Sequence, residues 1–180
     1  VDGMDVVNLI KQGDTLESIS IERIGDEANR FIANEESFSN YIALVNEKII
    51  VKQALRQTDF ENYANSTYPD AYKNESGYFT VINKKGDGNL VSNGQIVSVD
   101  ISLKANSGQV MREAGSPIKF TLGSGDIISV IDSNVIEMSI GESRTILATY
   151  EYVFGEAPSG NIPQDSFIIF DLVLISVEDN

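Results

Sequence analysis

The feature that most limits what this chain can fold into is a change of pattern at Gly77, after which short apolar segments alternate with glycine-rich turns. The segments are Tyr78 to Ile82, Ile96 to Leu103, Ile118 to Leu122, Ser143 to Thr149 and Phe167 to Val177. Runs of this kind, bounded by turn residues, are typical of strands that pair antiparallel. The second part of the chain is therefore predicted to form an antiparallel sheet.

One helical pattern interrupts the strands, between the third and the fourth. In the range 126–138 apolar residues recur with helical spacing, at Ile127, Ile128, Ile131, Val135 and Met138. A sheet with one apolar face needs a cover, and a single amphipathic helix can supply it. We therefore predict an α+β fold in which a curved antiparallel sheet wraps around one short helix.

The first part of the chain carries helical signals instead. Asp14 and Glu17 form the two ends of a capping box, which predicts that a helix starts here. An apolar stripe with helical spacing follows, made of Ile21, Ile24, Ala28, Phe31 and Ile32. We therefore predict that the sheet domain has an N-terminal helical extension.

The region between this helix and the sheet is less clear. Residues 42–57 fit a helix, whereas Lys48 to Val51 has the β-branched character of a strand, so both alternatives stay open. Residues 65–70 have the composition of a turn or linker. We predict a mainly helical segment with a linker over residues 1–75 and the sheet domain over residues 76–180.

The 180-residue chain contains no cysteine and no histidine. This composition excludes thiol nucleophiles, histidine general bases and the common zinc ligands, so we predict neither a metal site nor a cofactor. The formal net charge is −14, and an acidic surface repels phosphate backbones, so we predict no nucleic-acid binding. Any catalysis must use carboxylate, lysine, tyrosine or hydroxyl groups, or must need no proton transfer.

Several short motifs follow one another in the order found in one known family. They are Gly86-Asp87-Gly88, Gly94 to Val99, Ser116 to Gly123, Gly125 to Ile128, Met138 to Glu142, Tyr152 to Gly155, Asn161 to Pro163 and Phe167 to Leu174. In number and order these motifs resemble the FKBP-type peptidyl-prolyl isomerases. The resemblance implies an FKBP-like fold and activity on X-Pro peptide bonds, a reaction that needs no nucleophile.

The same resemblance assigns a substrate pocket. Its positions are Ile101, Met111, Arg112, Ile118, Phe120, Ile127, Ile128, Ile131, Phe154, Ile162 and Phe170. Ile131 stands where active members have a tryptophan as the pocket floor, and Phe154 stands where a tyrosine hydroxyl contacts bound carbonyls. Arg112 replaces an acidic residue. The pattern thus keeps the apolar character of the pocket and lacks part of its chemistry.

The N-terminal part carries a second, shorter resemblance. Asn29 to Ile32 and the helix around it look like the front part of uncharacterised FKBP-like lipoproteins of Gram-negative bacteria. That resemblance implies a lipid anchor on a cysteine upstream of Val1, and hence a place outside the cytoplasm, in the periplasm or on the outer membrane. It implies membrane contact only through such an anchor, and we expect a monomer.

Two functions stay open for this chain. The first is a weak peptidyl-prolyl isomerase that acts on X-Pro bonds of client proteins, so its partner is a proline-containing polypeptide. The second is an inactive module of the same fold that binds a protein partner. An open apolar hollow with a free backbone N–H near Ile162 favours the isomerase, whereas a pocket filled by Met111 or Ile131 favours the module.

Overall fold

The computed structural model describes all residues except 1–12, 16–17, 19, 21, 31–33 and 180. The chain forms two compact units, Val1–Lys48 and Ile49–Asn180. In the described part of the chain, no helix is both long and apolar enough to cross a membrane.

In the first unit, the described residues before Asp26 are not helical. The helix predicted to start at Asp14 is therefore not found among the described residues there, and the first helix that the described residues form, α2, spans Asp26–Arg30. Gly25 precedes α2 with a φ of 93°, a conformation outside the right-handed helix, so no helix continues through this position. Of the predicted stripe, Ile24 is exposed, and three members lie outside the described residues: Ile21, Phe31 and Ile32.

The next helix, α3, spans Glu35–Thr67, so its residues belong to both units. Asn34 and Ser37 cap its start reciprocally. The Asn34 side chain accepts from the Ser37 N–H at 2.8 Å, and the Ser37 hydroxyl oxygen accepts from the Asn34 N–H at 3.0 Å. The helix ends two residues before Pro69, because a proline disfavours the helical conformation of the residue before it.

This helix decides the alternative that the sequence leaves open at residues 42–57. The β-branched run Lys48 to Val51 lies inside α3. Each isoleucine or valine lowers helix stability by only about 0.5 kcal/mol, so three such positions do not break a long helix. The turn predicted for residues 65–70 starts only after Thr67.

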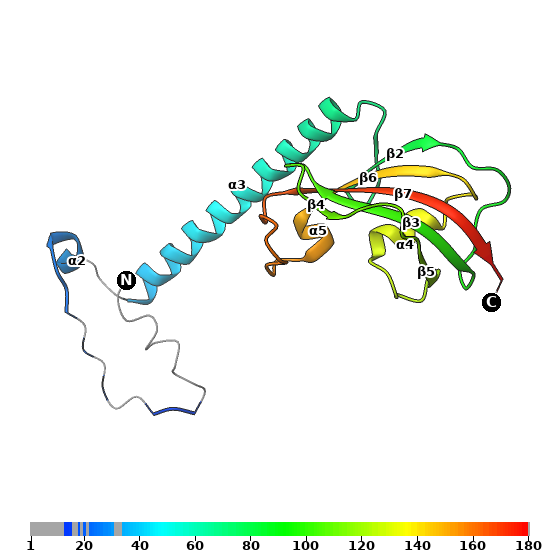
Figure 1. Cartoon of the computed structure of the whole chain (residues 1–180). Helices are drawn as coiled ribbons and strands as arrows, with labels where there is room; N and C mark the ends of the chain where they lie inside the picture. The colour runs from blue at the N-terminus through cyan, green and yellow to red at the C-terminus, as the bar shows by residue number, and fades with distance from the viewer. Residues whose placement is uncertain (1–12, 16–17, 19, 21, 31–33, 180) are drawn as a thin grey trace. The chain divides into compact units, whose positions relative to one another are not determined.

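The second unit is built on a seven-stranded antiparallel sheet with the order β1-β2-β6-β7-β3-β4, in which β5 also pairs with β3 (Figure 1). The strands are β1 Tyr72–Lys73, β2 Phe79–Lys84, β3 Ile96–Ala105, β4 Val110–Arg112, β5 Ile118–Thr121, β6 Ser143–Thr149 and β7 Phe167–Glu178. All the strands that the sequence predicts are formed. The two additional ones, β1 and β4, are too short to show a period of two in the sequence.

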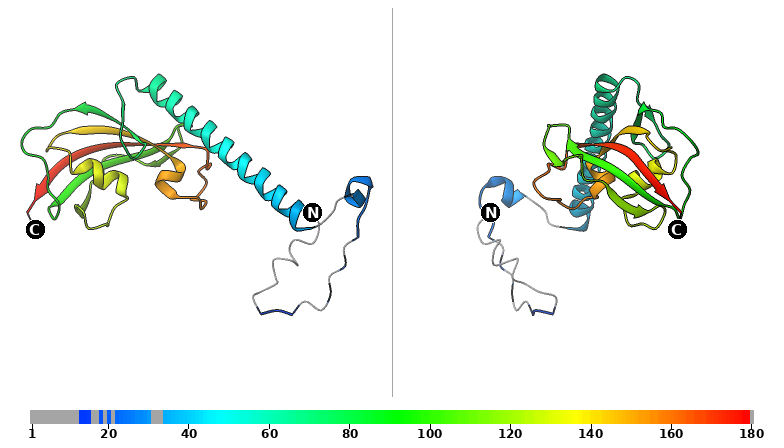
Figure 2. Two further views of the ribbon diagram at one scale, coloured as in Figure 1. Left: turned by 180° about the vertical axis from the view of Figure 1, so that it is seen from behind. Right: turned by 45° about the vertical axis from the view of Figure 1, so that its right-hand side comes forward.

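Two short helices, α4 (Ser129–Val135) and α5 (Tyr150–Phe154), lie on the same side of the curved sheet, which we call the inner face (Figures 1 and 2). Alternate residues of β7 pack into the core on this side: Ile168, Phe170, Leu172 and Leu174. The predicted α+β fold is thereby confirmed. The helix is shorter than the predicted range 126–138, because Ile128 is extended, with a ψ of 140°.

The opposite face of the sheet, which we call the outer face, is covered by the last turns of α3. Phe60 and Ala64 are fully buried there against three strand residues, Phe79, Leu147 and Ile169. Leu147 and Ile169 alternate with inner-facing neighbours, so β6 and β7 are buried on both sides. This end of both strands therefore reads as a continuous apolar run.

Aromatic rings make up much of the outer contact. The Phe60 ring lies 5.4 Å from the Phe79 ring and 5.2 Å from the Phe167 ring, measured between centroids. Because α3 packs on the sheet in this way, the second compact unit begins at Ile49. The sequence-based division into residues 1–75 and 76–180 stays a prediction about domains.

Candidate functional site

Four residues predicted for the substrate pocket form a buried floor on the inner face. Ile101 of β3, Phe120 of β5, Ile131 of α4 and Phe170 of β7 belong to one core cluster. Ile131, in the middle of α4, is only 3% exposed. Four elements that are far apart in the sequence therefore meet where the family resemblance places the pocket floor.

Five more predicted residues surround this floor and are half-buried: Met111, Ile118, Ile127, Phe154 and Ile162. They pack against the floor and keep part of their surface accessible. We call the floor and these five residues together the inner apolar site. Accessible apolar surface beside a packed core is suited to bind an apolar group by removing both from water. The role of these residues in binding stays a prediction.

The two remaining predicted residues lie differently. Ile128 is 39% exposed and stands before α4, outside the core cluster. Arg112 is held by the backbone, because its Nε donates to the Ile101 carbonyl at 3.0 Å and its Nη2 donates to the Ser116 carbonyl. The Arg112 guanidinium thus ties β4 and the loop after it to β3.

The loop after α5 is organised by a buried tyrosine that the sequence reasoning does not single out. The Tyr150 ring lies 5.1 Å from the Phe154 ring. The Tyr150 hydroxyl donates to the Ala157 carbonyl at 3.0 Å and accepts from the Ser159 N–H at 2.6 Å. A buried hydroxyl needs such partners. The only local signal for this role is the aromatic-rich run from Tyr150 to Phe154.

Of two positions that bear on the binding of a carbonyl at the inner apolar site, Phe154 and Ile162, only Ile162 supplies a hydrogen-bond donor. Phe154 has no hydroxyl, unlike the tyrosine that the family resemblance places there. The Ile162 N–H donates to the Ser159 carbonyl at 3.4 Å, a long and therefore weak hydrogen bond. The Ile162 amide is thus engaged, but it loses little if it turns to a ligand.

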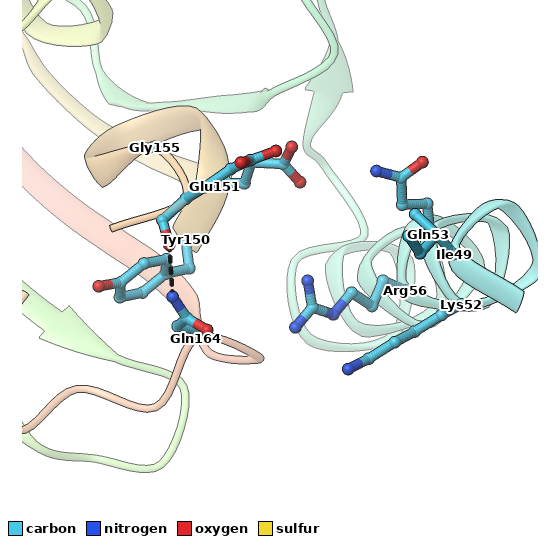
Figure 3. A pocket seen from close by; sticks show the side chains of 9 residues that line it. Ile49, Lys52, Gln53, Arg56, Tyr150, Glu151, Gly155 and Gln164 are labelled. Atoms are coloured by element: carbon cyan, nitrogen blue, oxygen red, sulfur yellow. Dashed lines mark hydrogen bonds between the residues drawn. The ribbon is translucent and has the colours of Figure 1, made fainter. Parts of the chain in front are cut away.

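A separate cleft lies between α3 and the segment from Thr149 to Phe167 (Figure 3). It consists of two hollows of about 470 and 240 Å³, which share the lining residues Gln53, Arg56, Tyr150, Glu151 and Gln164. No residue predicted for the substrate pocket lines either hollow. The cleft adjoins the inner apolar site, because Tyr150 lines the cleft and its ring contacts the ring of Phe154, which belongs to the inner apolar site.

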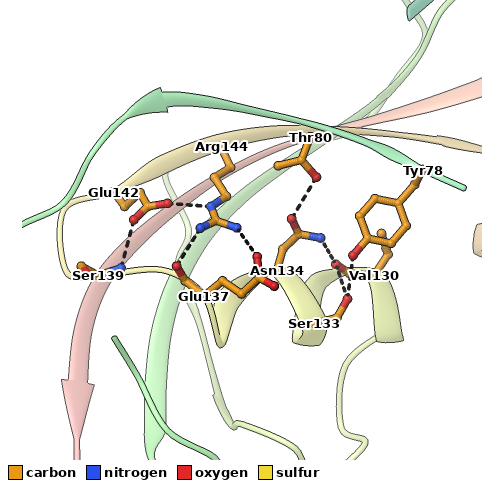
Figure 4. Close-up of polar contacts among 9 residues, drawn as sticks. All are labelled: Tyr78, Thr80, Val130, Ser133, Asn134, Glu137, Ser139, Glu142 and Arg144. Atoms are coloured by element: carbon orange, nitrogen blue, oxygen red, sulfur yellow. Dashed lines mark hydrogen bonds and ion pairs between the residues drawn. The ribbon is translucent and has the colours of Figure 1, made fainter. Parts of the chain in front are cut away.

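A buried ionic network holds the end of α4 against β6 (Figure 4). The Arg144 Nε donates to the Glu142 carboxylate at 2.6 Å, and its Nη2 donates to the Glu137 carbonyl at 2.7 Å. The second oxygen of Glu142 accepts from the Ser139 N–H at 3.2 Å. Arg144 and Glu142 are both buried, so this charge pair depends on the completeness of its hydrogen bonds.

Neutral polar groups fix the middle of the same helix (Figure 4). The buried Asn134 side chain accepts from the Thr80 hydroxyl at 3.1 Å and donates to the Val130 carbonyl at 2.8 Å. The Tyr78 hydroxyl lies 3.1 Å from the Ser133 hydroxyl. Since Ile131 stands on this helix, these bonds set the position of the floor of the inner apolar site.

The inner apolar site can hold an apolar group but offers no acid or base. None of its residues is ionisable. In the described part of the chain, no three acidic side chains are placed so that they could hold a metal ion. The arrangement is therefore suited to bind and orient a ligand and not to transfer protons.

Comparisons with known proteins agree with this geometry. The model of a family described as FKBP-type peptidyl-prolyl cis-trans isomerase matches residues 88–175. Peptidyl-prolyl cis-trans isomerase Fkbp12 of Drosophila melanogaster is 33% identical over 98 residues, which make up 52% of this chain and 91% of that protein. FK506-binding protein 2 of Aspergillus fumigatus is 39% identical over 62 residues, 34% of this chain, and the chain spans only 46% of its length.

Two crystal structures share the fold. A peptidyl-prolyl cis-trans isomerase of Pseudomonas syringae superposes with a TM-score of 0.58 and 19% identity, covering 68% of this chain and 91% of that one. FkpA from Escherichia coli superposes with a TM-score of 0.58 and 18% identity, covering 87% of this chain and 75% of that one. At such low identities the similarity concerns the fold alone.

Proposed function

The chain belongs to the FKBP-type peptidyl-prolyl cis-trans isomerases, and from this premise we propose that it catalyses the isomerisation of X-Pro bonds in client polypeptides, with weak activity. One observation carries the proposal. Nine of the predicted pocket residues, from six strands or helices and the loops around them, gather in the inner apolar site. This site offers apolar surface for a proline ring.

The isomerisation of an X-Pro bond needs few chemical groups from the protein. Rotation about an X-Pro bond breaks the resonance of the amide, with a barrier of about 18–20 kcal/mol. A site that binds the twisted amide better than the planar forms lowers this barrier without any acid, base or nucleophile. In this chain the apolar residues hold the proline ring away from water. In this proposal the Ile162 N–H, whose hydrogen bond to the Ser159 carbonyl is long, turns to donate to the carbonyl of the rotating bond.

Weak activity follows from the same residues. Phe154 lacks the hydroxyl that would supply a second donor, and the floor at Ile131 is aliphatic and packed in the core. Removal of one donor to a developing charge costs an enzyme about 3 kcal/mol where the donor is fully effective. We therefore place the activity of this chain well below that of members with the complete pocket.

A second candidate function is an inactive module that binds a protein partner without isomerising it. Two observations favour it. Ile131 is covered by its neighbours, with 3% exposure, and the Ile162 N–H already has a partner. The inner apolar site would then bind an apolar side chain of the partner instead of a rotating proline.

We also propose that the protein acts outside the cytoplasm as a lipid-anchored monomer. The support is the similarity of Asn29 to Ile32 and its surroundings to the front part of FKBP-like lipoproteins. Metabolic labelling of the full-length protein with a fatty-acid analogue, together with cell fractionation, tests this proposal. Absence of label from the mature protein would contradict it.

The isomerase is tested by the cis-to-trans relaxation of X-Pro tetrapeptides with and without the protein. Ile131→Arg is a poor probe, since a charge at this buried position would unfold the core. Ile162→Glu, at a half-buried rim position, should remove most of the acceleration and leave the fold intact. Leu90→Glu, at an exposed position that is 62% accessible, is the matched control and should change nothing.

The result separates the two candidate functions. Acceleration by the wild type that is lost in Ile162→Glu and kept in Leu90→Glu supports the isomerase. If the wild type leaves the relaxation rate unchanged at its highest soluble concentration, the isomerase is wrong for simple peptides and the binding module takes its place.

A further inference from the structure

The cleft beside α3 has a basic wall that the described residues do not neutralise. Lys52 and Arg56 stand one helical turn apart on α3 and both line the cleft (Figure 3). The Arg56 Nε is buried and has no hydrogen-bond partner among the described residues. No ion pair among the described residues involves Lys52 or Arg56. The chain as a whole has a net charge of −14.

The opposite wall is acidic and stays apart from the basic one. It carries Glu151, Glu156 and Asp165, none of which forms an ion pair among the described residues. The Gln164 side chain donates to the Glu156 carbonyl at 2.6 Å and stiffens this wall. The hollow of about 470 Å³ between the walls is large enough for a few residues of an extended peptide.

The unpaired arginine indicates what kind of group the cleft would take. A buried charged donor without a partner is costly, so a ligand that supplies an acceptor is favoured. A carboxylate fits best, because a guanidinium bonds it with two parallel hydrogen bonds and Lys52 adds a second charge. The acidic wall opposite can in turn accept hydrogen bonds from the backbone N–H groups of a peptide.

The cleft and the inner apolar site are neighbours. Tyr150 lines the cleft, and its ring packs at 5.1 Å on the Phe154 ring, which belongs to the inner apolar site. One aromatic pair thus separates the two places. A polypeptide with its proline at the inner apolar site would reach the cleft within a few residues, because an extended chain advances by about 3.3 Å per residue.

We propose that this cleft is a second subsite for client polypeptides, in which Lys52 and Arg56 bind the carboxylate of an aspartate or glutamate a few residues away from the proline. The inference rests on the proposed function, since it places the client's proline at the inner apolar site. It makes the protein selective for acidic client segments, despite its own acidic surface.

Fluorescently labelled peptides with a single proline test the proposal on the full chain. A series carries one glutamate at two to six residues from the proline on either side, and a matched series carries glutamine instead. For at least one spacing, the glutamate peptide should bind about 10-fold tighter in low salt, as expected for a charge-assisted hydrogen bond, and the preference should shrink in high salt. Fluorescence anisotropy gives the dissociation constants.

Variants assign the preference to the cleft. The double variant Lys52→Gln with Arg56→Gln should lose the preference for glutamate, whereas Lys85→Gln, an exposed lysine outside the cleft, should keep it. Glu151→Gln removes a competing negative charge and should strengthen the binding of the glutamate peptide. This gain cannot result from misfolding. Equal binding of glutamate and glutamine peptides at every spacing would overturn the proposal.

A proline-to-alanine peptide separates this inference from the isomerase. If both subsites hold one chain, the replacement should weaken binding of the glutamate peptide to the wild type. Unchanged binding would overturn the link between the two subsites. Because anisotropy needs no turnover, a glutamate preference without acceleration of tetrapeptides would reject the isomerase alone. Acceleration without a glutamate preference would reject the cleft alone.

Discussion

The two faces of the central sheet are covered in different ways. On the inner face, α4 is buried among strand residues, and Arg144, which forms a buried ion pair with Glu142, ties the segment after α4 to β6 by donating to the Glu137 carbonyl. On the outer face, α3 contributes Phe60 to a small aromatic cluster, and the ion pair at its end, between Lys73 and Glu61, is open to solvent. The inner face is a core, whereas the outer face is a docking contact.

The difference follows from where each cover lies in the chain. The inner cover, α4, stands between β5 and β6, within the range 88–175 that matches the family. The outer cover, α3, comes before β1 and lies outside that range. The range that matches the family therefore contains the inner cover, and α3, which forms the outer contact and lines the cleft, lies before this range.

The largest effect is expected when one buried phenylalanine is removed from each face, which compares how much the two covers stabilise the fold. Phe170→Ala should lower the free energy of unfolding by about 4 kcal/mol, because it leaves a cavity in the core. Phe60→Ala should cost less, about 2 kcal/mol, because α3 can detach locally. Chemical denaturation gives both values. Equal losses in a single cooperative transition would mean that the two faces form one core.

Amide hydrogen exchange shows which parts of the chain lose protection in each of these two variants. In Phe60→Ala, faster exchange should be confined to the last turns of α3 and β1, while β3 and β7 stay protected. In Phe170→Ala, protection should fall throughout the sheet.

The buried ion pair of the inner face gives the next largest effect. Arg144→Met leaves the Glu142 carboxylate buried without its partner, so it should lower the free energy of unfolding by about 3 kcal/mol. Adding Glu142→Gln removes the unpaired charge and should restore part of the loss. Thermal unfolding of the two single variants and the double variant measures the coupling. A double variant that loses the sum of both single effects would contradict a direct pairing.

A third prediction concerns the chemistry that only the inner face carries. Phe154→Tyr supplies the missing hydroxyl at the inner apolar site and should raise kcat/KM on X-Pro tetrapeptides about 10-fold, less than the full effect of an oxyanion-type donor. Phe38→Tyr, at an exposed position of α3, is the matched control and should leave the rate unchanged. A rise in both variants would point away from a specific donor.

The smallest effect belongs to the exposed ion pair of the outer face. The pKa of the Glu61 carboxyl is lowered, mainly by a hydrogen bond from the Gln57 side chain and next by the hydrogen bond and positive charge of Lys73. A carboxyl with a lowered pKa stabilises the fold above its unfolded pKa, and this contribution is lost as the pH falls through the folded pKa. The melting temperature of Glu61→Gln should thus lie slightly below that of the wild type at pH 7, and the gap should close in acid and in high salt.

Much of the fold could be predicted from the sequence because its signals are local. The strands β2, β3, β5, β6 and β7 and the centre of α4 follow from apolar periodicity alone. The positions of the inner apolar site followed from the order of the family motifs, since most of its residues were placed by matching segments. Ile128 shows the limit of this reasoning, because its apolar side chain is exposed at the start of α4.

Other features have no local signal. The bond from Thr80 to Asn134 joins residues 54 positions apart, and neither residue is part of an apolar pattern. Tyr150 organises a loop through partners seven and nine residues further along. The helix predicted at Asp14 is not formed by the described residues there, since a good local capping signal is not sufficient to make a helix stable.

The α+β class, the strands β2, β3, β5, β6 and β7 and the family can be inferred from the sequence, because a period of two or of 3.6 residues and the order of motifs are properties of the linear chain. Which helix covers which face, how Arg144 is neutralised and that Lys52 and Arg56 line a cleft with no ion-pair partner among the described residues became visible only in the folded structure. These features depend on contacts between segments that are far apart in the sequence. Such contacts, and the burial and charge pairing that they cause, arise only when the chain folds.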